Sequence, residues 1–386
     1  MLLPGRLSVC YLAPGCDFRP GSSHSREVLT LARALAREAD VTVAFRRAPA
    51  DASADGVRVV ALEPGPVPSG DAAPSRRALG RFVERRATGF GLVLEGTWSM
   101  PGKVTTWCAQ RGIPAIPVID RLPPASWLGP LDTGSVWLGL GASGRYLRRA
   151  PAVVTGSAEL RDTIVQRWRL DPDRIVALGP AIDRTVLAPG NQDEARRRLG
   201  LPLDHRILLT GDGLGRGADL TPLLQAVQRA GDPSLRVHVF GDGERRAALE
   251  RLAGPGGAIT FHGLVPDDLL ATYLAAADLC VSVGESGDPG FTIPEALSCA
   301  RPVAVATARD RLSFPVRHNV TGFVIEHDLL AWIRFLQRDC PSRNTLRMMG
   351  LAAGSTPFEH VDRIAVAYGL LMERVRAGAA HRVTAM

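Results

Sequence analysis

Three acidic residues that could do chemistry lie close together in the second half of the chain: Glu285, Asp288 and Glu295. An apolar run at 281–283 leads into a loop rich in Gly, Asp and Pro, and a helix is expected from the end of that loop to just before Pro302. Open α/β sheets bind ligands at the carboxyl ends of their strands, and helix starts bind phosphate. Carboxylates for hydroxyl groups and amides for a diphosphate are what a nucleotide-sugar site needs.

Polar residues after other expected strands could complete such a site. They are Gly21, Ser22 and His24 after the first strand, Glu95, Asp120 and Arg121 after two later strands, and Arg216 in a glycine-rich turn at 210–219. Purely structural interpretations stay open for several candidates. Arg216 and His24 could be solvated charged or polar residues, and Asp288 could be a turn residue that binds its own backbone. Ser22 could serve only as a helix cap, and Glu295 could serve only as an acidic residue in a first helical turn.

The elements that would position these residues alternate between strand-like and helical patterns, which is typical of parallel α/β sheets. Strands are expected at 7–13, 41–45, 57–62, 92–94, 116–119 and 152–155, and the last of these is expected to end the first half. The alternation restarts with strands at 206–210, 235–240, 259–262 and 279–283. The predicted domains are residues 1–185, residues 186–357 and a final helical segment, 358–386.

The stretch from Val281 to Val305 resembles the donor-site motif of retaining GT-B glycosyltransferases of family 4. Glu295 matches the second glutamate of that motif, and Gly290 matches a glycine of its loop. Gly287 stands where the first glutamate is expected, so either Asp288 or Glu285 would have to replace it. The resemblance implies a GT-B architecture: two Rossmann-like domains facing a central cleft, with the last helix crossing back to the first domain.

The resemblance also implies a role for each candidate residue. Arg216 matches a lysine that neutralises the leaving diphosphate, although Asp212 stands where the family has an arginine. The expected catalytic residues are Arg216, Asp288 and Asp120. The expected donor-binding residues are Glu295, Gly290, Phe291, Thr292, Arg216, Gly21 and Ser22. His24, Glu95 and Arg121 are expected on the acceptor side, and no residue is expected to bind a metal.

The function implied is transfer of a sugar from a nucleoside diphosphate sugar to a small-molecule or lipid acceptor, with retention and without a metal or other cofactor. Two alternatives stay open. The first is a catalytically weakened subunit that only binds nucleotide sugars, and the second is a GT-B epimerase or phosphorylase. The partners expected are the donor and the acceptor, and the sequence does not indicate an oligomeric state.

The composition of the chain bears on which ligands it binds and where it is located. The 386 residues carry a net charge of +7, and an excess of arginine suits anionic ligands. No zinc-finger, RNP or helix-turn-helix pattern predicts nucleic-acid binding. Six scattered cysteines without metal-ligand spacing, and no apolar run long enough to span a bilayer, indicate a cytoplasmic location. The arginine-rich stretch 76–86 leaves open a solvated helix face or contact with an anionic membrane bearing a lipid acceptor.

Overall fold

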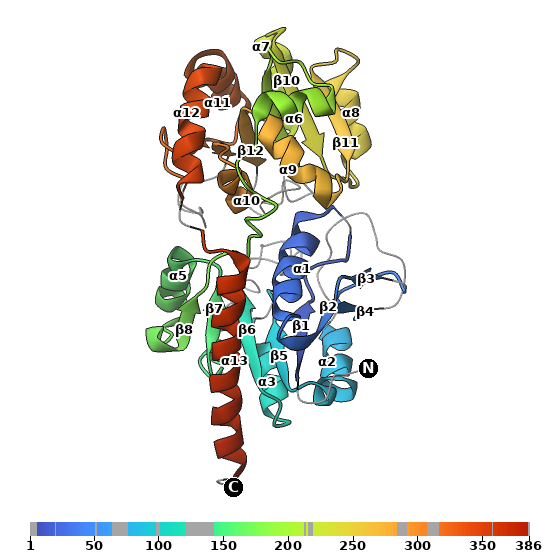
Figure 1. Cartoon of the computed structure of the whole chain (residues 1–386), viewed down its shortest axis with the longest axis vertical. Coiled ribbons are helices and arrows are strands. Elements are labelled where there is room, and N and C mark those ends of the chain that lie inside the picture. The colour runs from blue at the N-terminus through green and yellow to red at the C-terminus, as the bar shows by residue number, and fades with distance from the viewer. Residues whose placement is uncertain are drawn as a thin grey trace, which may run out of the picture. The chain divides into compact units, whose positions relative to one another are not determined.

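The chain folds into two compact units, shown in a computed structural model in Figure 1. Unit 1 comprises residues 1–19, 27–181 and 359–386, and unit 2 comprises residues 20–26 and 182–358. The structure describes residues 6–19, 21–50, 52–63, 76–97, 101–120, 143–211, 214, 219–283, 292–306, 316–356 and 358–384. The short segment 20–26, at the start of the first helix, therefore belongs with the second half of the chain.

Unit 1 is built on a sheet whose described strands run in the order β3-β4-β2-β1-β5-β6-β7-β8. The strands are β1 (Leu7–Ala13), β2 (Ala39–Phe45), β3 (Ser53–Ala54), β4 (Val57–Ala61), β5 (Leu92–Glu95), β6 (Ala115–Ile119), β7 (Val153–Thr155) and β8 (Ile175–Ala177). The helices are α1 (Ser23–Leu35), α2 (Arg76–Arg85), α3 (Lys103–Ala109), α5 (Ala158–Trp168) and α13 (Val361–Thr384), with 3-10 turns η1 (Ala87–Gly89) and η3 (Pro172–Arg174). All these strand pairs are parallel except β3 with β4.

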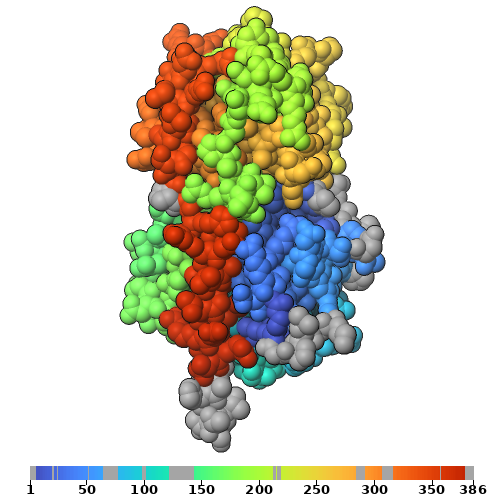
Figure 2. All heavy atoms as spheres, in the orientation of Figure 1, coloured from blue at the N-terminus to red at the C-terminus, as the bar shows by residue number. Residues whose placement is uncertain are grey.

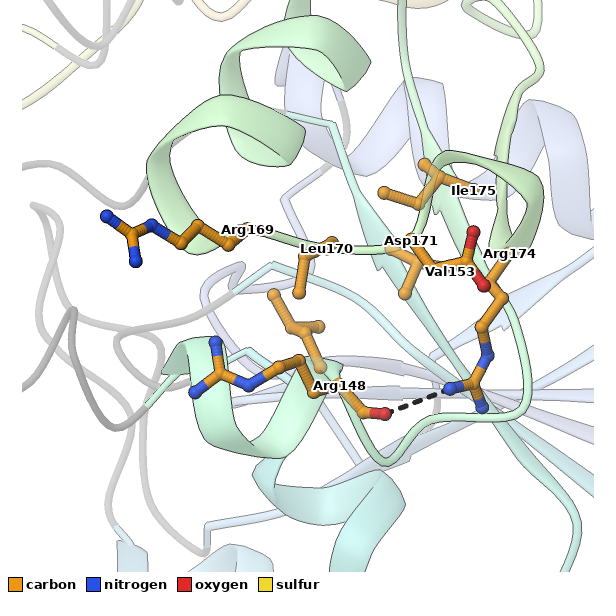
Figure 3. A pocket seen from close by; sticks show the side chains of 8 residues that line it. Arg148, Val153, Arg169, Leu170, Asp171, Arg174 and Ile175 are labelled. Atoms are coloured by element: carbon orange, nitrogen blue, oxygen red, sulfur yellow. Dashed lines mark hydrogen bonds between the residues drawn. The ribbon is translucent and has the colours of Figure 1, made fainter.

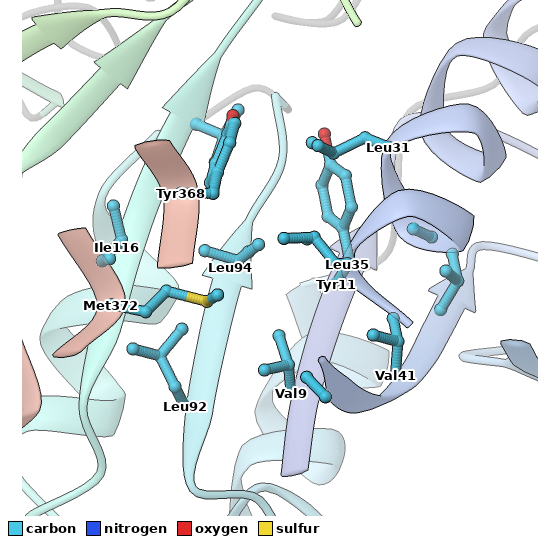
Figure 4. Close-up of a cluster of buried hydrophobic side chains, with 14 of the residues drawn as sticks. Val9, Tyr11, Leu31, Leu35, Val41, Leu92, Leu94, Ile116, Tyr368 and Met372 are labelled. Atoms are coloured by element: carbon cyan, nitrogen blue, oxygen red, sulfur yellow. The ribbon is translucent and has the colours of Figure 1, made fainter. Parts of the chain in front are cut away.

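The core of unit 1 follows from the alternation of side chains along buried parallel strands. Val9 and Tyr11 of β1, with Leu92 and Leu94 of β5, point to one face of the sheet and meet α1 and α13 there (Figure 4). The other face is covered by α2 and α3 through a separate apolar cluster. Helix α13 contributes Tyr368 and Met372 to the first cluster, and Figure 2 shows it lying along the surface of unit 1.

Unit 2 is a second parallel sheet, with the strand order β11-β10-β9-β12-β13-β14. Its strands are β9 (Arg206–Gly211), β10 (Leu235–Phe240), β11 (Ile259–Gly263), β12 (Leu279–Val283), β13 (Val303–Ala306) and β14 (Gly322–Ile325). Its helices are α6 (Gln192–Leu199), α7 (Thr221–Ala230), α8 (Arg246–Ala253), α9 (Asp267–Ala276), α10 (Ile293–Ser298), α11 (Leu329–Arg334) and α12 (Arg343–Gly354), with a π-helical turn η5 (Phe335–Asp339). Apolar clusters cover both faces of this sheet.

Strand order reverses once in each sheet, between β1 and β5 in unit 1 and between β9 and β12 in unit 2. Helices leave in opposite directions at such a switch point, which opens a crevice at the carboxyl ends of the two strands. The residues that follow β1, β5, β9 and β12 are therefore the ones best placed to meet a ligand. The predicted Gly21 and Glu295 are among these residues, and the predicted Glu95 ends β5 itself.

The amino edge of the unit 2 sheet is closed by a buried ion pair. Asp278 directly precedes β12, and its carboxylate accepts from Arg196 Nη2 at 2.7 Å and from the backbone N–H of Ile207 at 2.7 Å. Gln192 Nε2 at 3.0 Å and Arg343 Nε at 3.2 Å bind the other oxygen. The remaining guanidinium N–H groups of Arg196 bind backbone carbonyls, so the network ties α6 and α12 to the sheet.

The predicted α/β class is confirmed, and most predicted strands are correct to within two residues. One prediction was wrong: 152–155 is not the last strand of the first half, because Ile175–Ala177 pairs with β7 as β8. All six cysteines are free. Among the helices in the described ranges, none has the length and apolar character needed to cross a bilayer.

Candidate functional site

Glu295 is fixed at the carboxyl edge of the unit 2 sheet by the start of α10. Thr292 caps this helix: its Oγ1 accepts from the backbone N–H of Glu295 at 3.3 Å. In return, Glu295 Oε2 accepts from the backbone N–H of Thr292 at 2.6 Å, which completes a capping box. The predicted donor-binding residues Thr292 and Glu295 are therefore brought together, and the capping box restricts the rotamer of the carboxylate.

Arg26 binds the same carboxylate from the first turn of α1. Its Nε donates to Glu295 Oε1 at 2.8 Å, and its Nη2 donates to Glu295 Oε2 at 3.1 Å. Its Nη1 donates to Asp267 Oδ1 at 2.8 Å, at the start of α9. Arg26 and Glu295 are each about 6% exposed, whereas Asp267 is 40% exposed. The two-pronged contact with Glu295 is the strongest geometry that an arginine can make with a carboxylate.

The charges in this network stabilise one another. Burial alone would lower the pKa of Arg26, but Glu295 and Asp267 outweigh burial and raise it above its usual value. A carboxylate has about four lone-pair positions for hydrogen bonds. Among the described residues, Glu295 Oε2 accepts two hydrogen bonds and Oε1 accepts one. As far as the described residues go, this leaves one position on Oε1 for a hydroxyl group.

Gly21 and Ser22 shape the segment that delivers Arg26. Gly21 has a φ of 80°, and a Cβ atom there would lie 2.5 Å from the carbonyl oxygen of Val265. Only glycine tolerates both conditions, so this residue allows segment 20–26 to approach the strand ends of unit 2. Ser22 Oγ accepts a long hydrogen bond of 3.4 Å from the backbone N–H of Ser25, which is the capping interaction that the sequence left open.

A further charged group lies after β9 and β10 at the same edge. Asp219 accepts from Arg245 Nη2 at 2.8 Å and from the backbone N–H of Thr221 at 3.0 Å. Burial pushes the pKa of Asp219 upward, but the hydrogen bonds from Thr221 and Arg245 outweigh it and leave the pKa lowered. The Asp219 carboxylate is therefore ionised, and it binds a backbone N–H group in the first turn of α7.

In unit 1, Asp120 follows β6 and Thr97 follows β5, both at the carboxyl edge. The Thr97 hydroxyl donates to Asp120 Oδ1, and the backbone N–H of Asp120 donates to Thr97 Oγ1 at 3.2 Å. Asp120 also acts electrostatically on Tyr368 of α13. Burial raises the pKa of the Tyr368 phenol above its usual value, and the negative charge of Asp120 raises it further. The predicted catalytic residue Asp120 is thus half-buried and held in a fixed orientation by Thr97.

Glu95 has a use that the sequence did not indicate. Its side chain is buried and accepts from the backbone N–H of Val104 at 3.2 Å and of Thr105 at 2.6 Å. The hydroxyl of Thr105 donates to it at 2.7 Å. Because Gly102 at the start of α3 has no side chain to cap the helix, Glu95 satisfies these N–H groups instead. The structure thus gives Glu95 a part in supporting α3, and its expected place on the acceptor side stays a prediction.

Among the described residues of unit 1, one hollow lies at each of two opposite edges of the sheet. The larger, of about 500 Å3, lies between the carboxyl ends of β2 and β4 and helix α2, and Arg81, Arg85 and Arg86 line it over an apolar floor. The smaller, of about 220 Å3, lies at the amino ends of β7 and β8, where Arg174 Nη1 donates to the carbonyl oxygen of Arg148 (Figure 3). Since ligands bind at carboxyl ends in such sheets, only the larger hollow is a candidate site.

Comparison with known families identifies the chain. The family "Glycosyltransferase Family 4" matches residues 25–186, and the family "Glycosyl transferases group 1" matches residues 205–338. Together these matches take in most of the chain. The chain is a family 4-like glycosyltransferase. It is an enzyme that transfers sugar, which favours this function over the non-catalytic alternative left open by the sequence.

Known proteins similar to this glycosyltransferase agree with the assignment. D-inositol 3-phosphate glycosyltransferase 1 of Catenulispora acidiphila is 28% identical over 83% of this chain and 82% of that protein. Sucrose-phosphate synthase of Thermosynechococcus elongatus has a TM-score of 0.77 at 21% identity, covering 97% of this chain and 100% of that one. The Anabaena protein HepE, solved with UDP and glucose, has a TM-score of 0.68 at 15% identity, over 95% and 99% of the two chains. These likenesses show the GT-B fold.

Several predicted site residues of this glycosyltransferase lie outside the described residues. They are Arg121, Arg216, Glu285, Asp288, Gly290 and Phe291, together with the side chain of His24. Their roles stay predictions. Within the described ranges, no group of three or more His, Cys, Asp or Glu side chains is arranged as metal ligands would be. The expected absence of a metal also stays a prediction.

Arg26 is the site residue that sequence reasoning missed. Its signal was available in the helical pattern, because Arg26 shares the buried face of α1 with Leu29 and Ala32. A cation on the apolar face of a helix needs a carboxylate partner, since an unpaired charge is costly to bury. The partners lie 241 and 269 residues away in sequence, so only the fold could name them.

Proposed function

We propose that this glycosyltransferase moves a sugar from a nucleoside diphosphate sugar to a small-molecule acceptor, with retention at the sugar carbon and without a resident metal. The donor binds to unit 2 and the acceptor to unit 1. The Glu295 carboxylate carries the donor half of the proposal. It lies beside the switch point between β9 and β12, already fixed by Thr292 and Arg26, with one lone-pair position available for a ribose hydroxyl. The HepE structure with UDP and glucose supports a donor of this kind.

The chemistry requires the diphosphate to be stabilised as it leaves, because negative charge grows on the bridging oxygen in the transition state. Preorganised cations and backbone dipoles provide that stabilisation. By resemblance, Arg216 supplies the cation here, and Asp288 or Glu285 would hold a sugar hydroxyl. Asp120, fixed by Thr97, is proposed to act at the reacting end of the acceptor. Transfer with retention implies that the new bond forms on the face that the diphosphate leaves.

The acceptor is proposed to carry a phosphate group. Three arginine side chains line the hollow at the carboxyl ends of β2 and β4, and no acidic residue stands among the described residues that line it. Exposed guanidinium groups are well suited to phosphate because they can donate two hydrogen bonds in a fork. The D-inositol 3-phosphate glycosyltransferases among the relatives support an acceptor of this class. Substitution of Arg81 and Arg85 by Gln should raise the KM for myo-inositol phosphates and leave donor affinity unchanged. An unchanged acceptor KM would contradict this choice.

The donor role of Glu295 is tested by calorimetry with UDP, GDP and ADP. The nucleotide that binds the wild type best should bind Glu295→Gln more weakly by about 1–3 kcal/mol, the cost of poorly satisfied polar partners. Glu250→Gln is a matched control, since Glu250 is a glutamate of the same unit that binds only Arg246 on the exposed face of α8. Equal affinities for wild type and Glu295→Gln, with both proteins folded, would remove the basis of the proposal.

Retention and metal independence have separate readouts. The anomeric configuration of the product, followed by NMR during turnover, should match that of the donor sugar. Activity should persist after treatment with EDTA, because cationic side chains rather than a metal neutralise the diphosphate. An inverted product, or activity restored only by Mg2+ or Mn2+, would correct these two parts of the proposal.

A further inference from the structure

The first turn of α1 supplies unit 2 with a buried cation that no predicted role explains. Arg26 donates to both oxygens of Glu295 and to Asp267, so three charge-assisted hydrogen bonds fix its guanidinium. Its side chain is 6% exposed and lies on the carboxylate that is proposed to hold the donor ribose. Because its described hydrogen bonds lead to Glu295 and Asp267, its effect on a ligand is taken to act through Glu295.

We propose that Arg26 is a positioning residue for Glu295, and that it sets the preference of the enzyme for a ribose over a deoxyribose. This inference rests on the proposed function of Glu295 in donor binding. Arg26 holds the carboxylate in one rotamer, with the lone pair on Oε1 directed to one place. A ribose hydroxyl that donates to that lone pair is then recognised without further rearrangement.

The hydrogen-bond arrangement explains why the arginine is suited to this task. The capping box constrains Oε2 alone, through the N–H of Thr292. The guanidinium fork adds a second donor to Oε2 and the one described donor to Oε1, which prevents rotation of the carboxylate about its last bond. A lysine would supply a point charge without the fork, so it keeps the charge and loses the orientation. Asp267 holds the fork from the other side.

The competing explanation is that Arg26 only stabilises the fold. A structural role would weaken every nucleotide equally, because it acts through the fraction of folded protein. A positioning role weakens only ligands that use Glu295. Nucleotides without the ribose hydroxyl that Glu295 accepts are therefore the discriminating probes, and both the 2′-deoxy and the 3′-deoxy forms are needed because the contacted hydroxyl is to be identified.

The experiment measures calorimetric affinities of the best-bound nucleoside diphosphate and of its 2′-deoxy and 3′-deoxy forms for the full-length wild type, Arg26→Lys, Glu295→Gln and the double variant. The wild type should prefer the ribose form over one deoxy form by about tenfold or more. Arg26→Lys should lose most of that preference, with little change for the deoxy form. The double variant should lose no more than Glu295→Gln alone, because both changes remove the same contact.

Two variants keep the test decisive. Arg343→Lys changes a half-exposed arginine at the amino edge and should leave the preference intact. Asp267→Asn loosens Arg26 without changing Glu295, and it replaces Arg26→Lys if that variant does not fold. Equal losses for ribose and deoxyribose forms in Arg26→Lys would overturn the positioning role. If Glu295→Gln removes the preference and Arg26→Lys retains it, only this inference fails. If Glu295→Gln retains it, the proposed donor contact itself fails.

Discussion

Unit 2 contains two buried arginine–carboxylate networks, one at each edge of its parallel sheet. At the amino edge, Asp278 accepts four hydrogen bonds, two on each oxygen, so its lone-pair positions are filled by the protein. At the carboxyl edge, Glu295 accepts three from the described residues and keeps one position on Oε1. An arginine–carboxylate pair therefore has a purely structural role at the amino edge. At the carboxyl edge, such a pair leaves one position on the carboxylate for a further hydrogen bond.

The pKa values of the two arginines, Arg196 and Arg26, are shifted in opposite directions. Burial lowers the pKa of Arg196, and the positive charge of Arg343 lowers it further. Asp278 compensates only partly, since most N–H groups of Arg196 face neutral carbonyls. The pKa of Arg26 is raised instead, since two carboxylates outweigh its burial. Around Arg26, two carboxylates face one guanidinium, so negative charge is in excess at the carboxyl edge. A carboxylate in such surroundings can accept hydrogen bonds from the hydroxyl groups of a ligand. The balance of charge thus distinguishes the functional edge from the structural one.

Breaking the closed network should have the largest effect on stability. Asp278→Ala leaves the fully buried Arg196 without its carboxylate, and loss of one partner of a buried pair typically costs about 3–5 kcal/mol. Urea unfolding should show this loss, while nucleotide affinity per folded molecule should stay as in the wild type. A loss below about 1 kcal/mol would show that water or relaxation replaces the carboxylate, and that the amino edge is not a rigid tie.

Acid should weaken unit 2 through a histidine pair beside the carboxyl edge. Burial lowers the pKa of His238 from 6.5 to about 4, and His262 and Arg236 add to this effect. His238 Nδ1 lies 2.8 Å from His262 Nε2, so one ring donates to the other. Because the unfolded chain binds a proton near pH 6.5 and the folded chain resists it until about pH 4, stability falls as pH falls through this range.

The expected loss between pH 7 and pH 4 is up to about 3 kcal/mol from this residue. His238→Gln, which does not titrate, should show a flatter dependence of unfolding free energy on pH than the wild type, whatever its stability at pH 7. Parallel curves for the two proteins would assign the acid sensitivity to other groups.

Gly21→Ala should destabilise the folded protein, because Gly21 lies where segment 20–26 contacts Val265. Left-handed backbone costs a non-glycine residue about 1–3 kcal/mol, and the added Cβ would also press on the carbonyl of Val265. Gly56→Ala is the matched control, because Gly56 has a φ of 72° and nothing within 4 Å of the added atom. The excess loss at Gly21 over Gly56, measured by thermal unfolding, isolates the close approach. Equal losses would mean that backbone strain alone decides.

The smallest effect is expected from the cap of α10. Thr292→Ala removes the hydroxyl that caps the helix and should cost about 1 kcal/mol. Thr292→Ser keeps the hydroxyl and should cost less. Nucleotide affinity should fall modestly in Thr292→Ala, because Arg26 still holds Glu295. Loss of affinity as large as in Glu295→Gln would show that the capping box, rather than Arg26, fixes the carboxylate.

The sequence predicted the fold class and most strands because apolar alternation records burial directly. The positions of Thr292 and Glu295 at a helix start were also predictable from a local motif. The contact of Arg26 with Glu295 was not, since it joins residues far apart in the chain and depends on how segment 20–26 packs. Glu95 was placed on the acceptor side because a strand end indicates only an edge. It does not indicate whether a neighbouring helix start uses the carboxylate.

The most direct test is a crystal structure of the enzyme with a bound nucleoside diphosphate. Our account predicts a ribose hydroxyl within about 3 Å of Glu295 Oε1, with Arg26 still bridging both oxygens of that carboxylate. A ribose bound away from Glu295 would contradict the donor site. A ribose bound to Glu295 after Arg26 has moved away would contradict the role of Arg26 as the residue that positions it.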